Sequence, residues 1–281
     1  MAKLVTPRPF VKWVGGKTQL VNELLKRTPP FFKKYYEPFV GGGAFFFALH
    51  RDRGIKRAHL ADLNLELMDT YKAIRDDVVK LVELLAGYPH DKNFFYEIRA
   101  QNPENMTPIE RAARMIYLNK TCYNGLYRVN RKGQFNVPFG SYKSPKICDE
   151  KNLLAVSKTL RNVEFECAAF DDILKKVQKD DLVYFDPPYE PISKTANFTS
   201  YQQGGFTQDS QERLRDVCHK LTRRKVKFIL SNSSANLIRE LYGSNGFHVN
   251  EVLATRSINS NPQKRGKLTE LIVTNYLPED A

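Results

Sequence analysis

A chain of 281 residues with 42% hydrophobic content can bury a substantial core, and we expect one or two domains. Its 44 basic and 31 acidic residues give a net charge of +13, which is typical of a nucleic-acid-binding protein. No apolar run approaches the ~20 residues of a membrane span, and residues 1–12 lack the apolar core of a secretion signal. The four scattered cysteines indicate neither a zinc site nor a disulfide framework. A cytoplasmic protein is therefore predicted.

The segment FVKWVGGKT at residues 10–18 ends like a phosphate-binding loop but does not match one. Such a loop needs the pattern G-x-x-x-x-G-K-[ST], and Val11 stands at its first glycine position, which disfavours an ATPase. Two glycines beside Trp13 and two lysines still indicate a backbone that approaches a ligand closely. A helix is expected next, over residues 19–27, because the Pro29-Pro30 pair ends it.

Residues 34–62 contain the first half of a nucleotide-binding unit. A predicted strand leads into Gly41-Gly42-Gly43-Ala44 and then into a helix, although Phe46 stands where the last glycine of G-x-G-x-x-G belongs. The next predicted strand ends at Asp62, about 20 residues past the glycines, where an acid binds ribose hydroxyls in such folds. Asp62 is also a candidate cap for the following helix, and the two roles are compatible.

The stretch from residue 65 to residue 120 has helical periodicity, and Thr107-Pro108 is a helix-start signal. From Arg111 to Lys146 the chain then carries eight basic residues, six aromatic residues and no acidic residue. Within it, residues 126–130 and 134–137 predict a β-hairpin. A basic two-stranded ribbon fits the major groove of DNA, and the alternative is an ordinary exposed hairpin.

After about residue 145 the sequence returns to alternating strands and helices. A polar loop is expected at residues 190–205, and a final antiparallel pair at 247–255 and 270–276. The other expected elements are strands at residues 163–167, 181–185 and 226–231 and helices at 210–223 and 235–242.

The tetrapeptide Asp186-Pro187-Pro188-Tyr189 follows an unbroken apolar strand that should be buried on both faces. The prolines cannot donate to a sheet ladder, so the strand must stop there, at the sheet edge where ligands bind in open α/β folds. Asp186 with a neighbouring carbonyl can accept hydrogen bonds from an exocyclic amino group and free its lone pair, while Tyr189 stacks on the base. The alternative is a proline-rich turn capped by an aspartate.

Several motifs together resemble the Dam-type DNA adenine methyltransferases, which act on GATC and use S-adenosylmethionine. The likeness follows the family's order over nearly the whole chain. The matching elements are residues 12–17, 37–44, 61–62, 123–130, 134–140, 186–189, 197–199 and 230–232. The resemblance implies a Rossmann-like α/β methyltransferase sheet with helices on both faces, formed by residues 1–65 and 148–281. It also implies an inserted, mainly helical DNA-recognition domain with a β-hairpin at residues 66–147.

The resemblance also assigns roles around the cofactor, S-adenosylmethionine, and implies no metal because the sulfonium is already an activated methyl donor. Asp186, Pro187 and Tyr189 would form the catalytic turn, with Asp186 near the methionine end of the cofactor. Asp62 would bind the ribose and Phe170 the adenine. The other cofactor-binding residues would be Trp13, Lys17, Glu37, Phe39, Gly41 and Gly43.

Double-stranded DNA is the implied partner, with no membrane and no obligate protein partner. Arg128 would read a guanine, as Arg commonly does through a bidentate contact. Tyr123 would occupy the space left by a flipped adenine. The remaining DNA contacts would come from Lys12, Asn124, Leu126, Asn130, Asn136, Pro138 and Tyr142. Ser141 stands where the family often carries a basic residue, so no phosphate contact is expected there.

Other functions compete with adenine methylation. Methylation of the cytosine amino group usually accompanies Ser at the position of Asp186, and methylation at ring carbon 5 needs a Pro-Cys nucleophile that this chain lacks. A catalytically inactive DNA-binding regulator is the alternative from another class, and the intact residues 186–189 argue against it. Some relatives with these motifs read a longer site such as GATATC, so the longer site is an alternative to GATC. A methyltransferase that is paired with a restriction nuclease has the same motifs as a solitary one, so both contexts stay open.

Overall fold

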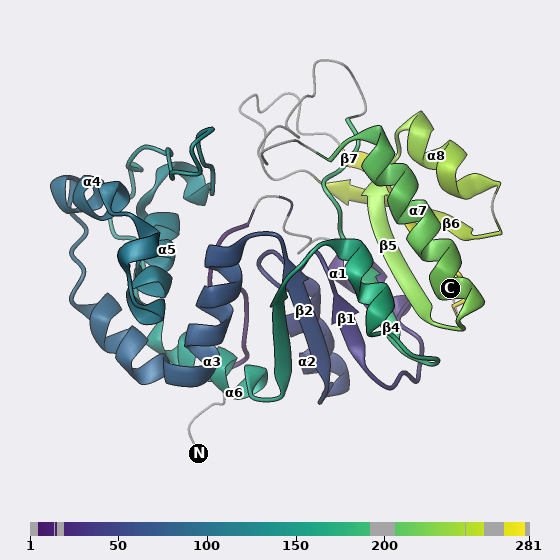
Figure 1. The fold of residues 1–281 in the computed structure, drawn as a ribbon, viewed down its shortest axis with the longest axis horizontal. Helices are drawn as coiled ribbons and strands as arrows, with labels where there is room; N and C mark the ends of the chain where they lie inside the picture. The colour runs from purple at the N-terminus through teal and green to yellow at the C-terminus, as the bar shows by residue number, and fades with distance from the viewer. Residues whose placement is uncertain are drawn as a thin grey trace. The chain divides into compact units, whose positions relative to one another are not determined.

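The computed structural model describes residues 5–13, 15, 20–191, 206–244, 246–255 and 267–278. Among them, seven strands form one sheet in the order β3-β2-β1-β4-β5-β7-β6 (Figure 1). The central pairs β1–β4 and β4–β5 are parallel, whereas β7 is antiparallel to both β5 and β6. The strands are β1 (Tyr35–Glu37), β2 (Ala58–Asp62), β3 (Val163–Cys167), β4 (Leu182–Phe185), β5 (Lys227–Ser233), β6 (His248–Thr255) and β7 (Lys267–Thr274). The predicted Rossmann-like α/β class is confirmed.

The chain divides into two compact units. The first comprises Met1–Gly16, Val40–Lys56 and Leu60–Cys167, and the second comprises Lys17–Phe39, Arg57–His59 and Ala168–Ala281. The boundaries of a recognition domain at residues 66 and 147 stay a prediction. No helix in the described ranges is both long and apolar enough to cross a membrane.

The first unit is mainly helical. Its α3 (Leu65–Ala86) packs against α5 (Pro108–Thr121) and α6 (Glu150–Leu160), and α4 (Lys92–Ala100) packs against α5. Its α2 (Ala44–Arg53) follows the glycine turn directly. Short 3-10 turns lie at Pro103–Asn105 and Tyr123–Gly125.

Side-chain caps fix where two of these helices begin. Thr107 and Glu110 form a reciprocal capping box at the start of α5, which confirms the predicted helix start. At the start of α3 the cap is Asn64, whose side chain accepts from the backbone N–H of Leu67 (2.9 Å). The suggestion that Asp62 caps this helix is therefore wrong.

The predicted hairpin forms around Gly133, where the N–H of Asn130 donates to the carbonyl of Gln134 (2.8 Å) and the N–H of Asn136 donates to the carbonyl of Arg128 (3.0 Å). A single bridge pairs Val129 with Phe135, and the rest of the two predicted strands around Gly133 has no regular ladder. The Asn130 side chain accepts from the backbone N–H of Lys132 (2.9 Å), so local hydrogen bonds replace part of the ladder. We call residues 123–142 the recognition segment.

The second unit holds β1, β4, β5, β6 and β7 with the helices α1 (Val21–Lys26), α7 (Gln208–Arg223) and α8 (Asn236–Gly243) and the 3-10 turn η3 (Phe170–Lys175). Every residue of β4 is at most 1% exposed. Because successive strand residues point to opposite faces, both faces of β4 are covered, as its apolar sequence predicts. Apolar side chains of α7 and α8 form one core cluster with Val183, Phe185, Phe228 and Leu230.

Candidate active site

Asp186 is held at the carboxyl end of β4 by a chain of hydroxyl groups. Ser231, on the neighbouring strand β5, donates to Asp186 Oδ1 (3.0 Å). The Tyr184 hydroxyl lies 2.9 Å from Ser231 Oγ. A serine hydroxyl has one proton, so when Ser231 donates to Asp186 it must accept from Tyr184. Tyr184 and Ser231 are at most 1% exposed, and the chain therefore fixes the orientation of the carboxylate.

The turn after Asp186 is tied to the end of β5. The buried Gln211 donates to the carbonyl of Pro188 (3.3 Å) and accepts from Asn232 (3.1 Å). Ser233 donates to the carbonyl of Glu190 (2.7 Å). These bonds give the proline turn one conformation, because its backbone carbonyls already have fixed donors.

Tyr189 is oriented through its hydroxyl, which donates to Glu270 Oε2 on β7 (2.8 Å). Burial, followed by the negative charges of Asp186 and Glu270, raises the pKa of Tyr189 well above its ordinary value. The phenol therefore remains a protonated donor at neutral pH, and its hydrogen bond fixes the ring.

Three phenylalanines form an aromatic wall in the same unit. Phe39 stacks on Phe170 with ring centroids 5.5 Å apart, and Phe206 meets Phe39 edge-on at 5.7 Å. Phe39 also contacts Phe185, the residue before Asp186, at 6.4 Å. The Arg213 guanidinium lies 5.4 Å from the Phe170 ring. The structure thus brings two predicted cofactor residues, Phe39 and Phe170, to the strand that delivers Asp186.

Glu37 is a buried acid in this unit, with 3% of its surface exposed. The Tyr35 hydroxyl donates to Glu37 Oε2 (2.7 Å), and burial raises the pKa of Tyr35 well above its ordinary value. The Glu37 carboxylate is thus held in a fixed position by a neutral donor.

The glycine turn of the first unit is closely packed. Gly41 has a φ of +47°, its N–H donates to Asp62 Oδ2 (3.1 Å), and its carbonyl accepts from the Tyr71 hydroxyl (3.0 Å). A Cβ on Gly41 would lie 2.5 Å from Trp13 Cδ1. The turn therefore needs glycine here both for its left-handed backbone and for its contact with the indole.

Asp62 is a buried carboxylate held by backbone donors. Its Oδ1 accepts from the N–H of Asn64 (2.9 Å), and only 8% of the residue is exposed. Burial raises the pKa of Asp62, although the backbone N–H groups partly offset that effect. Asp62 makes no ion pair with any described residue, so it remains an acceptor for neutral hydroxyl groups.

We expect Gly43→Ala to lower the free energy of unfolding by about 1–3 kcal/mol, because Gly43 has a φ of +70°. A Cβ there would also lie 2.7 Å from the hydroxyl of Tyr71, which is fully buried. Urea unfolding measures the loss. Gly54→Ala is the matched control, since Gly54 ends the same helix with a φ of +60° and open space around its Cβ. Equal losses in the two variants would contradict the close contact with Tyr71.

Asn119 joins two stretches that carry predicted DNA-binding residues. Its side chain accepts from the N–H of Lys12 (2.8 Å) and donates to the carbonyls of Lys12 (2.8 Å) and Gly125 (3.0 Å). The Lys12 ammonium donates to the Tyr142 hydroxyl (3.2 Å) and lies 5.0 Å from the centre of that ring. Lys12 is thus brought to the recognition segment from the far end of the sequence.

Within the recognition segment, Arg128 is paired with Asn136. Arg128 Nε donates to Asn136 Oδ1 (2.7 Å), and Nη2 donates to the Asn136 carbonyl (3.3 Å). Tyr123 is 54% exposed and its N–H donates to the carbonyl of Pro138 (2.8 Å). The other predicted DNA-binding residues, Asn124, Leu126 and Asn130, lie in the same segment.

Trp13 connects the glycine turn to the recognition segment. Its ring stacks on Tyr127 with centroids 5.2 Å apart and planes 25° apart, and Tyr127 meets Phe135 edge-on at 5.8 Å. Burial raises the pKa of Tyr127 to about 12, so its phenol is neutral at physiological pH. This ring packing, together with the hydrogen bonds of Asn119 to Lys12 and Gly125, links the cofactor and DNA elements predicted in this unit.

The structure places the predicted residues in two sets, one in each unit. The first unit holds Trp13, Gly41, Gly43, Asp62 and all nine predicted DNA-binding residues, whereas the second holds Glu37, Phe39, Phe170 and residues 186–189. Lys17 lies outside the described residues. Sequence reasoning assigned no role to Ser231, Glu270 or Asn119, and only Ser231 carried a signal, because it belongs to the motif at residues 230–232.

A family comparison identifies the class to which this fold and these residues belong. The family described as D12 class N6 adenine-specific DNA methyltransferase matches residues 13–258. The chain belongs to this family and is an adenine-specific DNA methyltransferase.

Curated relatives align with nearly the whole chain. A protein named Type II methyltransferase M.MjaIII from Methanocaldococcus jannaschii is 43% identical, covering 96% of this chain and 99% of the relative. Type II methyltransferase M1.LlaDCHI from Lactococcus lactis subsp. cremoris is 41% identical, covering 96% and 95%. The DNA adenine methylase of Escherichia coli K12 is 36% identical, covering 94% of each chain.

Proposed function

We propose that the enzyme transfers a methyl group from S-adenosylmethionine to the exocyclic amino group of an adenine flipped out of duplex DNA, within the sequence GATC. The observation that carries this proposal is Asp186, fixed by Ser231 at the carboxyl end of a buried parallel strand and followed at once by a rigid turn and an oriented tyrosine. Relatives 36% identical to this chain are named DNA adenine methylase, which supports adenine as the methylated base. The choice of GATC comes from the resemblance of the sequence motifs to the Dam-type enzymes.

Asp186 would accept a hydrogen bond from the adenine amino group. That bond pulls the nitrogen towards a pyramidal geometry, so its lone pair is less delocalised into the ring. Ser231 keeps the carboxylate oriented, and Pro187 keeps the following turn rigid. Tyr189 would stack on the flipped base, with its hydroxyl held by Glu270. These residues position the reacting nitrogen and form no covalent bond to it.

The side chains of the proposed cofactor-binding residues are chemically suited to the adenine, ribose and sulfonium groups of S-adenosylmethionine. When bound, that molecule supplies a methyl group on a cationic sulfur. Phe39 and Phe170 offer aromatic faces to an adenine, and the Glu37 carboxylate favours a nearby cation. A carboxylate has about four acceptor positions, and backbone N–H groups use only part of those on Asp62, which leaves room for ribose hydroxyls.

The backbone of the glycine turn is suited to close contact with the cofactor. Side chains at Gly41 and Gly43 would strike Trp13 and Tyr71, so the turn presents bare backbone there. We propose that Trp13 and Lys17 bind the cofactor together with this turn. Phe39 and Gly41 are separated by a single residue in the sequence.

The recognition segment would read the DNA. Arg128 is proposed to read a guanine, with Leu126 and Pro138 against base edges and Tyr123 in the space left by the adenine. Lys12 and Tyr142, which contact one another, would meet the outer base pairs. The remaining proposed contacts to bases or phosphates come from Asn124, Asn130 and Asn136.

Tritiated methyl transfer to matched duplexes tests this proposal. We expect incorporation into a duplex with one GATC site and none into the same duplex with GTAC. A third duplex that contains GATATC but no GATC should also stay unlabelled. Labelling of the GATATC duplex alone would assign the longer site, and labelling of no duplex despite DNA binding would support a DNA-binding regulator.

A further inference from the structure

Three chain segments rich in lysine and arginine enter the sheet at one edge of the second unit. Residues 33–34 precede β1, residues 175–181 precede β4, and residues 220–227 lead into β5. Because these three strands are parallel, all three segments lie at their amino ends. Together the segments hold ten basic and two acidic residues. Asp186 follows β4 at the opposite edge.

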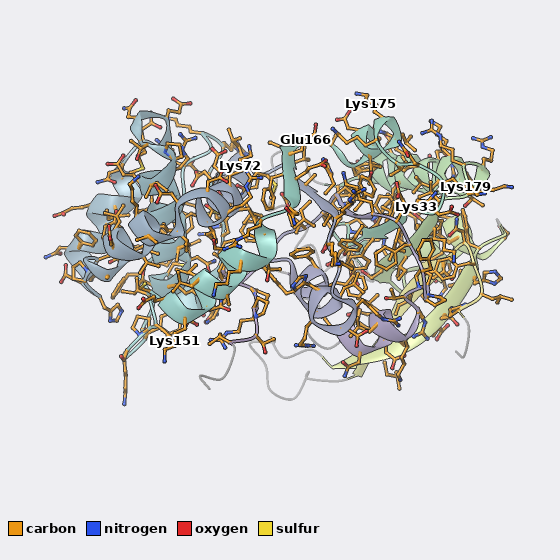
Figure 2. The ribbon with its side chains drawn as sticks, turned by 90° about the horizontal axis from the view of Figure 1, so that it is seen from below. Lys33, Lys72, Lys151, Glu166, Lys175 and Lys179 are labelled. Carbon is orange, nitrogen blue, oxygen red and sulfur yellow. The ribbon has the colours of Figure 1, made fainter. Side chains whose placement is uncertain are left out.

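Backbone hydrogen bonds hold the three segments together. The N–H of Lys33 donates to the carbonyl of Asp180 (2.9 Å), and the N–H of Asp180 donates to the carbonyl of Lys225 (3.1 Å). The Lys33 ammonium also reaches the carbonyl of Lys179 (3.4 Å), and Figure 2 shows these two lysines near one another. The fold thus places basic residues from three segments that are far apart in sequence next to one another.

The acids at this edge neutralise only part of the charge. Asp180 pairs with Lys33 (3.1 Å), and Asp172, just before the second segment, pairs with Lys175 (2.5 Å). Asp181 is buried, where it accepts from the N–H of Gln178. In contrast, Lys179, Lys220, Arg223 and Lys225 are exposed and make no ion pair with the described part of the chain. We call the exposed residues Lys33, Lys175, Lys179, Lys220, Arg223 and Lys225 the basic edge.

We propose that the basic edge binds the phosphate backbone of a second DNA segment without reading its sequence. The seven residues of β5 span about 23 Å, so the basic edge and Asp186 lie at well-separated ends of the sheet. The enzyme acts on DNA, and a long DNA substrate presents many phosphates beyond any one recognition site. Flexible ammonium groups on an exposed surface suit such phosphates, because they need no base edge and no fixed geometry.

The consequence is a protein that bridges two DNA segments. One segment would be engaged for methylation, while another is held by salt-sensitive phosphate contacts at the basic edge. Such contacts raise affinity for DNA that lacks the target site and leave the methyl-transfer step unchanged. This inference rests on DNA as the substrate and does not depend on GATC as the site.

The test removes three charges that have no ion-pair partner, in a Lys179→Gln, Lys220→Gln, Arg223→Gln variant. A second variant, Lys151→Gln, Lys158→Gln, Arg161→Gln, removes the same charges from exposed positions on and just after α6 in the other unit. Binding to a site-free 30-base-pair duplex is followed by fluorescence anisotropy across a salt series. In the first variant, the magnitude of the slope of log K against log salt concentration should fall by roughly 2–3. Its affinity at low salt should fall on the order of tenfold. The second variant should match the wild type in both quantities.

Bridging is measured with a bead-bound duplex that carries the methylated site and a labelled, site-free duplex in solution. Wild type and the α6 variant should retain the label, and the basic-edge variant should release it. Single-turnover transfer to a short duplex with one site should be the same in all three proteins, which shows that each is folded. An unchanged salt slope in the basic-edge variant, or equal losses in both variants, would overturn the proposal. The proposal would also be overturned if the basic-edge variant lost binding to anionic phospholipid vesicles while its DNA binding stayed unchanged. That result would make the basic edge a lipid-binding surface.

Discussion

Asp186→Ala is expected to lower the single-turnover rate of methyl transfer on the order of a thousandfold. The variant would lose the proposed acceptor of the adenine amino group. Affinity for the duplex should be little changed, because the proposed base-reading residues lie in the other unit. Rapid-quench transfer and anisotropy binding, measured on the same protein, separate the two effects.

Ser231 supplies the matched control for this loss. Ser231→Ala removes the donor to Asp186 and should slow transfer less than Asp186→Ala does, because the carboxylate remains but is no longer oriented. Ser231→Thr retains the hydroxyl and should restore most of the rate. If Asp186→Ala keeps substantial turnover, or if the threonine variant is no better than the alanine variant, the proposed role of this carboxylate is wrong.

Arg128→Ala should relax sequence choice at one base pair of the site. A bidentate contact between arginine and guanine is worth about 1–3 kcal/mol of discrimination, or roughly 5–150-fold. In the structure the Arg128 guanidinium is held in place by the side chain and carbonyl of Asn136. The measurement is kcat/KM on a set of duplexes in which each position of GATC is varied in turn.

Arg128→Lys is the control, since it keeps the charge and loses the planar fork. Its kcat/KM profile should resemble that of the alanine variant in sequence choice, while its affinity for site-free DNA should stay near that of the wild type. A uniform loss on all duplexes in the alanine variant, with full recovery in the lysine variant, would make Arg128 a phosphate contact and not a base reader.

The sheet strands and the polar residues that follow them could be predicted, because each is indicated by a pattern of residues adjacent in the sequence. The apolar run before Asp186 has no solvent-facing alternation, which predicts a fully buried strand, and β4 is one. The glycines at 41 and 43 precede a helix, and both adopt the left-handed backbone that explains them. In the same way, the pair Thr107-Pro108 predicts a helix start, and Thr107 caps α5 there.

The contacts within the candidate site could not be predicted, because they join residues far apart in sequence. Ser231 reaches Asp186 only because β5 lies beside β4, and Glu270 reaches Tyr189 from β7. Strand order is not encoded in any local pattern. The predicted hairpin around Gly133 forms, since Val129 pairs with Phe135 in antiparallel fashion. Its strands are shorter than predicted, because the Asn130 side chain satisfies nearby backbone donors.

The identity of the methylated nucleoside tests the central proposal most directly. Wild-type enzyme is incubated with S-adenosylmethionine and either the GATC duplex or its GTAC partner, and the DNA is digested to nucleosides for mass spectrometry. We predict N6-methyladenine from the GATC duplex and no methylated nucleoside from the GTAC duplex. A methylated cytosine, or equal methylation of both duplexes, would contradict the proposal that an adenine amino group in GATC meets the Asp186 turn.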